Sequence, residues 1–249
     1  MENYLHEYLT MLQVEKNLSL NTIQAYKQDL NVYLSFLGEQ ESISSLSEIS
    51  QKNIRQFIRS LSKIDLAPAS MARIFSSIRS YHAFLTDEKY LDENPSLQLV
   101  APKMPKKLPE ILSVEEIDSI IQTVETKTAI GKRDKAILEI LYSCGLRVSE
   151  LCTLSLGEVF FEEGVIRVTG KGNKQRMVPL GKNIKHILNE YLIHARPGLA
   201  KKSSIGAVFL SRNGKALTRM SIFNIVKKWV KTAEIYKSVS PHTFRHSFA

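Results

Sequence analysis

Residues 1–89 constrain the fold most, because apolar side chains recur there every three or four positions and no alternating strand pattern interrupts them. The four apolar runs lie near Tyr4–Leu12, Ile23–Leu37, Ile54–Leu61 and Met71–Leu85. Ser19 is placed to cap the second helix and Gly38 to end it, while the fourth helix begins after Pro68 with Ser70 as its expected cap. This spacing predicts a four-helix bundle.

Prolines break the helical pattern after residue 89. The segment Ala101–Glu110 reads A-P-K-M-P-K-K-L-P-E, and Asn94-Pro95 precedes it. We therefore expect residues 90–110 to be a basic, proline-stiffened linker between two domains, residues 1–89 and 111–249. Such a linker could cross a phosphate backbone, or it could simply join the domains.

The second half of the chain combines helices with a small sheet. Ser113 and Glu116 form a capping box that opens a helix at Val114–Val124. Further helices are predicted at Asp134–Cys144, Val148–Leu154, Ile184–His194 and Met220–Ile235, and short strands within Val159–Thr169 and at Gln175–Leu180 and Ala207–Leu210. The predicted fold class is mainly α: a four-helix N-terminal domain, followed by an α+β domain with a small antiparallel sheet.

The excess of positive over negative charge is confined to residues 101–249. Residues 1–100 carry 9 Lys+Arg and 12 Asp+Glu, whereas residues 101–249 carry 25 and 13. An excess of this kind indicates a domain that binds a polyanion, with nucleic acid as the first candidate. A basic surface without such a partner remains the alternative. In the first half, Arg55, Arg59, Arg73 and Arg79 could face DNA or be ordinary solvated charges.

Arginine stands at a helix start in the segment Tyr142–Leu154, which reads Y-S-C-G-L-R-V-S-E-L-C-T-L. Gly145 ends one helix, Arg147 opens the next, and Glu150 follows one turn later. Because the first turn of a helix leaves backbone N–H groups free, an arginine there is suited to hold a phosphate. A simple i,i+3 ion pair between Arg147 and Glu150 explains the same pattern.

A second helix start of this kind lies in Ser240–Ala249, S-P-H-T-F-R-H-S-F-A. Its Ser-Pro opening is typical of a capped helix, and His242 and Arg245 then share one face of the first turn. Taken singly, these two residues could equally be a buried or capping histidine and a surface charge. Phe244 and Phe248 should face a core, and since the helix has barely begun, the chain looks cut short.

Cysteine usage and hydropathy predict a cytoplasmic protein. Cys144 and Cys152 lie among apolar residues without metal-ligand spacing, as expected for buried thiols in a reducing compartment. Met1–Thr10 lacks the pattern of a signal peptide, and no apolar run approaches the roughly 18 residues that a membrane span needs. Membrane insertion is therefore not expected. We find no carboxylate cluster with the spacing of a metal-dependent nuclease.

Three segments in this order resemble the catalytic domain of the tyrosine recombinases, the phage-integrase-like site-specific recombinases. They are G-L-R-V-S-E-L at Gly145–Leu151, G-K-G-N-K-Q-R-M-V-P-L at Gly170–Leu180, and Ser240–Ala249. The helical segment Ser19–Leu30 extends the resemblance to essentially the whole chain and points to the Xer subgroup. The resemblance implies a SAM-like core-binding domain at 1–89 and a recombinase catalytic domain at 111–249.

The resemblance also implies a reaction: cutting and rejoining of double-stranded DNA through a 3′-phosphotyrosine, without metal or nucleotide cofactor. Arg147 and Arg245 would clamp the scissile phosphate. Lys171 would protonate the departing 5′ oxygen, and His242 would hydrogen-bond at the phosphate. Glu150 would support the site by orienting Arg147. Proteins of this subgroup act as homo- or hetero-tetramers on DNA and resolve chromosome dimers.

One departure from the family concerns the nucleophile. In the family, the nucleophilic tyrosine follows the His-x-x-Arg motif, and none of the nine tyrosines of this chain does. We expect the catalytic domain to be incomplete at Ala249. Three alternatives stay open: a non-catalytic DNA-binding relative, an integrase that serves a mobile element, and, less favoured, a nuclease or topoisomerase-like phosphoryl transferase. The reading frame beyond codon 249 separates the enzyme from the binder.

The missing nucleophile predicts that the 249-residue chain forms no covalent bond to DNA. The chain is incubated with a nicked or bubbled target duplex and the mixture is run on a denaturing gel. We expect free DNA only, because a phosphotyrosine linkage needs a positioned tyrosine hydroxyl. A protein–DNA adduct would show that another tyrosine serves as nucleophile.

Overall fold

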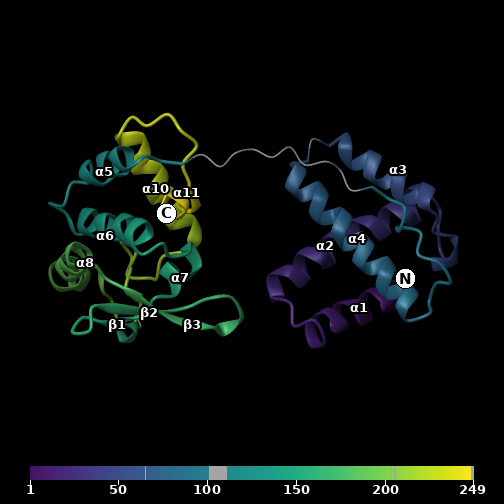
Figure 1. The fold of residues 1–249 in the computed structure, drawn as a ribbon, viewed down its shortest axis with the longest axis horizontal. Helices are drawn as coiled ribbons and strands as arrows, with labels where there is room; N and C mark the ends of the chain where they lie inside the picture. Colours follow the sequence, from purple (N-terminus) through teal and green to yellow (C-terminus); the bar gives the residue numbers. More distant parts are fainter. Residues whose placement is uncertain (65, 101–110, 203, 205, 248–249) are drawn as a thin grey trace. The chain divides into compact units, whose positions relative to one another are not determined.

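The chain folds into two compact units, Met1–Lys107 and Leu108–Ala249, each with its own hydrophobic core (Figure 1). The computed structural model describes residues 1–249 except 65, 101–110, 203, 205 and 248–249, and describes residue 171 by its backbone alone. The proline-rich part of the predicted linker, 101–110, lies outside the described residues. Leu91 and Leu99, from the earlier part of that linker, are buried in the core of the first unit.

Within its described residues, the first unit contains four α-helices, as predicted. They are α1 (Glu2–Val14), α2 (Leu20–Gln40), α3 (Gln51–Ser62) and α4 (Pro68–Asp87), with a short 3-10 helix at Leu46–Glu48. Tyr8, Tyr33 and Tyr81 are fully buried where these helices meet. Such large side chains bury enough apolar area to hold a bundle of this size together.

The predicted N-cap is correct for α2 and wrong for α4. Ser19 caps α2, because its hydroxyl accepts a hydrogen bond from the backbone N–H of Thr22 at 3.3 Å. Ser70 does not cap α4, which already begins at Pro68 with Ala67 as its N-cap. Proline is pre-organised for the first helical position, so the N-cap lies three residues earlier than predicted, at Ala67 instead of Ser70.

Gly38 does not end α2, which continues to Gln40. The chain turns instead at Ser42, whose φ of 53° lies in the left-handed region. The backbone N–H of Ile43 then donates to the carbonyl of Leu37 at 3.0 Å, and the Ile43 side chain is buried. The tertiary contact of Ile43 therefore sets the helix end, and a glycine inside the helix is tolerated at modest cost.

The second unit packs seven described helices with one three-stranded sheet. The helices are α5 (Val114–Gln122), α6 (Ala129–Ser143), α7 (Val148–Thr153), α8 (Lys182–His194), α9 (Arg196–Leu199), α10 (Arg219–Thr232) and α11 (Pro241–His246). The strands β1 (Val159–Phe160), β2 (Val165–Thr169) and β3 (Gln175–Pro179) pair antiparallel in chain order, and 3-10 turns lie at Leu156–Glu158 and Lys171–Asn173. This confirms the predicted fold class.

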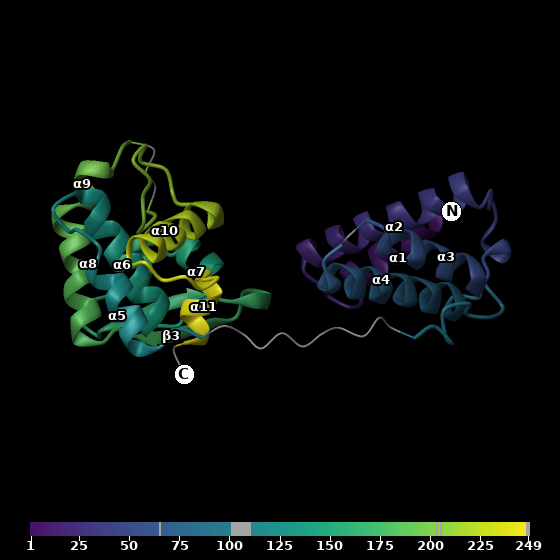
Figure 2. The same cartoon turned by 90° about the horizontal axis from the view of Figure 1, so that it is seen from above.

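Helix α6 is the central element of the second unit. It contacts α5, α8, α10 and α11, and Figure 2 shows it between α8 and α10. The sheet lies along one side of the unit (Figure 1), and Ile166, Val168 and Val178 turn their side chains from it into the same core. The helices and the sheet therefore share one hydrophobic core, which gives α7, β3 and α11 a common support.

A buried polar network fixes α10 and the segment before it to α6. The carboxylate of Asp134 accepts hydrogen bonds from Arg133 at 2.6 Å and from the indole of Trp229 at 3.0 Å. Arg133 also donates to the carbonyl of Leu210 at 2.9 Å. The predicted strand Ala207–Leu210 forms only isolated bridges, Ser155↔Ala207 and Leu210↔Ala216, because side chains take part of its backbone pairing.

The cysteines, the membrane-span criterion and possible metal ligands can also be compared with the described residues. Cys144 is a buried free thiol and Cys152 a half-buried one, and burial raises the pKa of both. None of the described helices is long and apolar enough to span a bilayer. The described residues hold no group of three His, Cys, Asp or Glu that could bind a metal ion.

Two glycine substitutions should have opposite effects on stability. A Cβ at position 131 would lie 1.8 Å from the carbonyl oxygen of Glu125, so we expect Gly131→Ala to destabilise the second unit by about 1–3 kcal/mol through overpacking. Position 38 has nothing within 4 Å, so Gly38→Ala should stabilise the first unit by about 0.5–1 kcal/mol.

Urea unfolding followed by two signals tests this pair. Trp229, the one tryptophan in the sequence, reports on the second unit, and helical circular dichroism reports on both. An unchanged Trp229 transition in the Gly131→Ala variant would contradict the packing at the start of α6.

Candidate active site

Glu150 on α7 is the buried centre of a cluster of three arginines. Its side chain is 1% exposed. Oε1 accepts hydrogen bonds from Nη1 of Arg147 at 2.9 Å and from Nη1 of Arg176 at 2.7 Å. Oε2 accepts from the backbone N–H of Arg147 at 2.8 Å and from Nη2 of Arg176 at 2.9 Å, and Nη1 of Arg245 lies 3.9 Å away. One carboxylate thus gathers three guanidinium groups.

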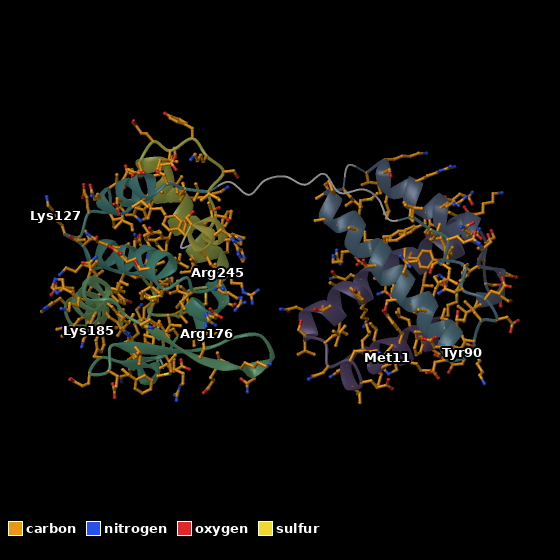
Figure 3. The ribbon with its side chains drawn as sticks, viewed as in Figure 1. Met11, Tyr90, Lys127, Arg176, Lys185 and Arg245 are labelled. Carbon is orange, nitrogen blue, oxygen red and sulfur yellow. The ribbon has the colours of Figure 1, made fainter. Side chains whose placement is uncertain are left out.

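The three arginines come from elements that are far apart in the sequence. Gly145, with φ of 55°, turns the chain after the end of α6. Arg147 follows as the N-cap residue of α7. Arg245 comes from α11 and donates a hydrogen bond to the carbonyl of Gly145. Figure 3 labels Arg176 and Arg245, which approach α7 from β3 and from α11. The Arg147–Glu150 pair is local in sequence, whereas the fold of the second unit brings Arg176 and Arg245 to it.

The hairpin between β2 and β3 begins against this cluster. A Cβ at Gly170 would lie 3.4 Å from Oε1 of Glu150, so the start of the hairpin lies beside the carboxylate. The backbone N–H of Gly170 donates to the carbonyl of Lys174 at 2.8 Å, and Gly172 turns the chain with φ of 72°. Lys171 therefore follows directly on a residue that lies beside the cluster, at the tip of the hairpin.

His242 and Arg245 share the short helix α11. Phe244 is fully buried and anchors this helix in the core, while Phe248 lies outside the described residues. The His242 side chain is exposed, and its ring stacks on that of His246 with 6.2 Å between centroids. The structure therefore brings Arg147, Glu150 and Arg245 into contact, and it places His242 one turn before Arg245 on the exposed side of α11.

The electrostatics of the cluster favour an anion. Burial by itself would raise the pKa of Glu150, but hydrogen bonds from Arg176 and Arg147 outweigh it and lower that pKa to about 2. Burial, together with repulsion from Arg147, lowers the pKa of Arg245. The side chains of Arg147, Arg176 and Arg245 are 47%, 39% and 29% exposed. Three accessible cations around one buried anion leave an excess positive charge that suits a phosphate group.

Arg176 is the cluster residue that the sequence patterns did not single out. It pairs in register with Val168, which is buried, and Val178 two positions later is buried as well. Alternate residues of a strand share one face, so Arg176 lies on the face of β3 that is turned to the core. A charged residue at such a position needs a charged partner. Strand alternation in the sequence indicates that need, but it does not identify Glu150 as the partner.

Comparison with known proteins identifies the class. The phage integrase family matches residues 110–249, and the N-terminal SAM-like domain of phage integrases matches residues 5–89. The chain belongs to the phage integrase family, the tyrosine recombinases, as the resemblance predicted. Within this family it is similar to tyrosine recombinase XerD of Staphylococcus haemolyticus, with 40% identity over 249 residues that cover 100% of this chain and 84% of the relative.

Solved structures show the same fold. A lambda integrase dimer bound to a COC′ core site matches with a TM-score of 0.77 and 17% identity, covering 100% of this chain and 88% of that one. XerH site-specific recombinase bound to palindromic difH substrate matches with a TM-score of 0.74 and 22% identity, covering 100% and 77%. Both likenesses confirm the two-domain, mainly helical architecture.

The cluster predicts that Glu150→Gln destabilises the second unit by about 1.5–3 kcal/mol, the scale of hydrogen bonds to a charged group. The folded-state pKa of about 2 lies below the ordinary value of 4.5. Glu150 therefore stabilises the fold fully above pH 4.5, and this contribution is lost as the pH falls toward 2. Trp229 unfolding curves at several pH values measure the effect.

Glu190→Gln is the matched control. Glu190 forms an ion pair with Lys132 at 2.9 Å, but its side chain is 39% exposed. Surface pairs of this kind contribute about 0–1 kcal/mol, so the control should unfold close to the wild type. If both substitutions lowered the free energy of unfolding equally, the burial of Glu150 would not be the source of its contribution to stability.

Proposed function

We propose that this protein performs site-specific recombination on double-stranded DNA through a 3′-phosphotyrosine intermediate, with Xer-type resolution of chromosome dimers in the cytoplasm as its role. The observation that carries this proposal is the convergence of Arg147 and Arg245 on Glu150. The identity to XerD over the whole chain supports the Xer role. The likeness to recombinases solved with DNA supports duplex DNA as the partner.

Arg147 and Arg245 clamp the scissile phosphate in this proposal. When an oxygen nucleophile attacks the phosphorus, negative charge grows on the non-bridging oxygens. Two planar guanidinium groups, charged at every relevant pH, match that distribution with paired N–H donors. Each uses Nη1 for a contact within the protein, to Glu150 or to the carbonyl of Gly145, and a guanidinium carries five N–H donors in all. The internal contacts orient both groups before DNA arrives.

Lys171 supplies the proton for the leaving group. As the bond between phosphorus and the 5′ oxygen breaks, an ammonium at the hairpin tip gives its proton to that oxygen. General-acid catalysis of this type contributes about 10²–10⁴-fold. His242, one turn before Arg245, hydrogen-bonds at the same phosphate. Since the covalent phosphotyrosine retains the energy of the phosphodiester, the free 5′ hydroxyl of another strand can reverse the step without ATP.

Chromosome-dimer resolution requires four protein copies on two DNA sites, so we assign a homo- or hetero-tetramer as the working state on DNA. The basic second half of the chain, with 25 Lys+Arg against 13 Asp+Glu, supplies the electrostatic attraction to the duplex. Recombination between two copies of one site would then convert a chromosome dimer into monomers.

Arg147→Ala and Arg245→Ala should each slow strand cleavage by about 10²–10³-fold, the scale for loss of one donor to a developing oxyanion. The assay uses the product of the whole gene and a duplex recovered from genomic DNA by its binding to that protein. Cleavage is followed as a covalent protein–DNA adduct on a denaturing gel.

Lys127→Ala is the control for loss of positive charge. Figure 3 shows Lys127 on the side of the second unit away from Arg245. It should cleave at the wild-type rate. All three variants should bind DNA with an affinity that falls steeply from 50 to 200 mM salt, because phosphate contacts release counterions. Cleavage at an undiminished rate by both arginine variants would refute the clamp.

A further inference from the structure

Arg176 stands where the hairpin meets α7. It is the second residue of β3, and the hairpin tip with Lys171 lies just before it. Its Nη1 donates to Oε1 of Glu150 at 2.7 Å, and its Nη2 donates to Oε2 at 2.9 Å. This two-point contact fixes both the distance and the angle between the strand and the helix, because both partners are planar.

The same contact involves the beginning of the hairpin. A Cβ on Gly170 would lie 3.4 Å from Oε1 of Glu150 and 3.5 Å from Nη1 of Arg176. The start of the hairpin therefore lies beside the Arg176–Glu150 pair, with room for about one methyl group between them. Because Arg176 belongs to β3 and pairs with Val168 of β2, the pair with Glu150 ties the hairpin itself to α7.

Glu150 in turn contacts the two arginines of the clamp. It accepts hydrogen bonds from the side chain and the backbone of Arg147, and it lies 3.9 Å from Nη1 of Arg245. Glu150 is therefore the shared neighbour of the clamp and of the hairpin. Arg176 supplies the only two-point side-chain contact to Glu150 among the described residues.

We propose that Arg176 is a positioning residue for recombination: by clamping Glu150 it holds the hairpin with Lys171 in register with Arg147 and Arg245. This inference rests on the proposed function, because register matters only if these groups act on one phosphate. Arg176 itself need not touch DNA. Its effect passes through Glu150 and through the pairing of β3 with β2, which carries the hairpin.

The chemistry of the position requires arginine. A lysine there would keep the positive charge beside Glu150, but its single ammonium cannot match both carboxylate oxygens in a fixed plane. Misplacement of a catalytic group by about 1 Å can cost 10²-fold in rate. Arg176→Lys therefore separates positioning from charge.

Arg167→Lys is the matched control. Arg167 lies on the neighbouring strand β2, opposite Met177, and its guanidinium stacks on Phe160 at 5.5 Å. Arg167 and Val168 are successive residues of β2, so Arg167 faces away from the core and from Glu150. The same substitution on the other face of the same sheet should leave cleavage unchanged.

The first experiment measures cleavage, DNA affinity and the Trp229 unfolding midpoint for wild type, Arg176→Lys and Arg167→Lys, each as the product of the whole gene. We expect Arg176→Lys to cleave about 10²-fold more slowly, the cost of misplacing a catalytic group by about 1 Å. Its DNA affinity should stay within about threefold of wild type, because the positive charge is kept. Its unfolding midpoint should stay near that of Arg167→Lys. Wild-type cleavage by Arg176→Lys would overturn the inference.

The second experiment asks whether the defect lies in proton donation. A duplex with sulfur in place of the 5′ bridging oxygen has a leaving group that departs as a thiolate and needs no proton. If Arg176 positions Lys171, the Arg176→Lys defect should shrink at least about tenfold on this duplex, within the range that a general acid contributes. A general loss of folding would slow both duplexes equally, and that result would overturn the inference.

The two levels of the proposal fail differently. If the wild type forms no adduct on either duplex, the proposed function fails. If the wild type cleaves and Arg176→Lys shows the same defect on the oxygen and sulfur duplexes, only the positioning role fails. Arg147→Ala serves as reference, because loss of a phosphate clamp should not be rescued by the sulfur leaving group.

Discussion

A carboxylate that is almost completely buried, surrounded by three guanidinium groups, organises the second unit. Removing a carboxylate from water is costly unless it is paired and hydrogen-bonded. Glu150 meets both conditions, with donors from Arg176, from the Arg147 side chain and from the Arg147 backbone. Because each arginine comes from a different element, satisfying this one acid forces α7, β3 and α11 into a single arrangement. The excess of positive charge that remains is what suits the site to a phosphate.

Short elements carry this site, so their positions depend on the core beneath them. Helices α7 and α11 have six residues each, too few to be stable alone. Leu151 and Phe244 are buried and anchor them to the core around α6. The buried network of Arg133, Asp134 and Trp229 ties α6 to α10. Precision at the site therefore comes from long-range packing.

The first unit has a core of its own with different polar partners. Tyr33 and His82 share a hydrogen bond of 2.9 Å in its interior, and burial lowers the pKa of His82 to about 4, so the ring is neutral at physiological pH. Arg73, one of the four arginines that could have faced DNA, pairs with the buried Asp29 at 2.7 Å. Arg79 lies over the ring of Phe75 at 5.9 Å. These two side chains therefore have structural contacts within the unit.

Local patterns in the sequence were sufficient to predict most of the helices and strands and the caps at Ser19 and Ser113, because these depend on neighbours within a few residues. Short motifs were likewise sufficient to identify the family. Three features depend on tertiary structure: the position where α2 ends, the limited pairing of Ala207–Leu210, which forms only isolated bridges, and the presence of Arg176 in the site. Arg176 and Glu150 are 26 residues apart, and Arg245 and Gly145 are 100 apart. No periodicity records such contacts, because burial of one charge chooses its partners only after the chain has folded.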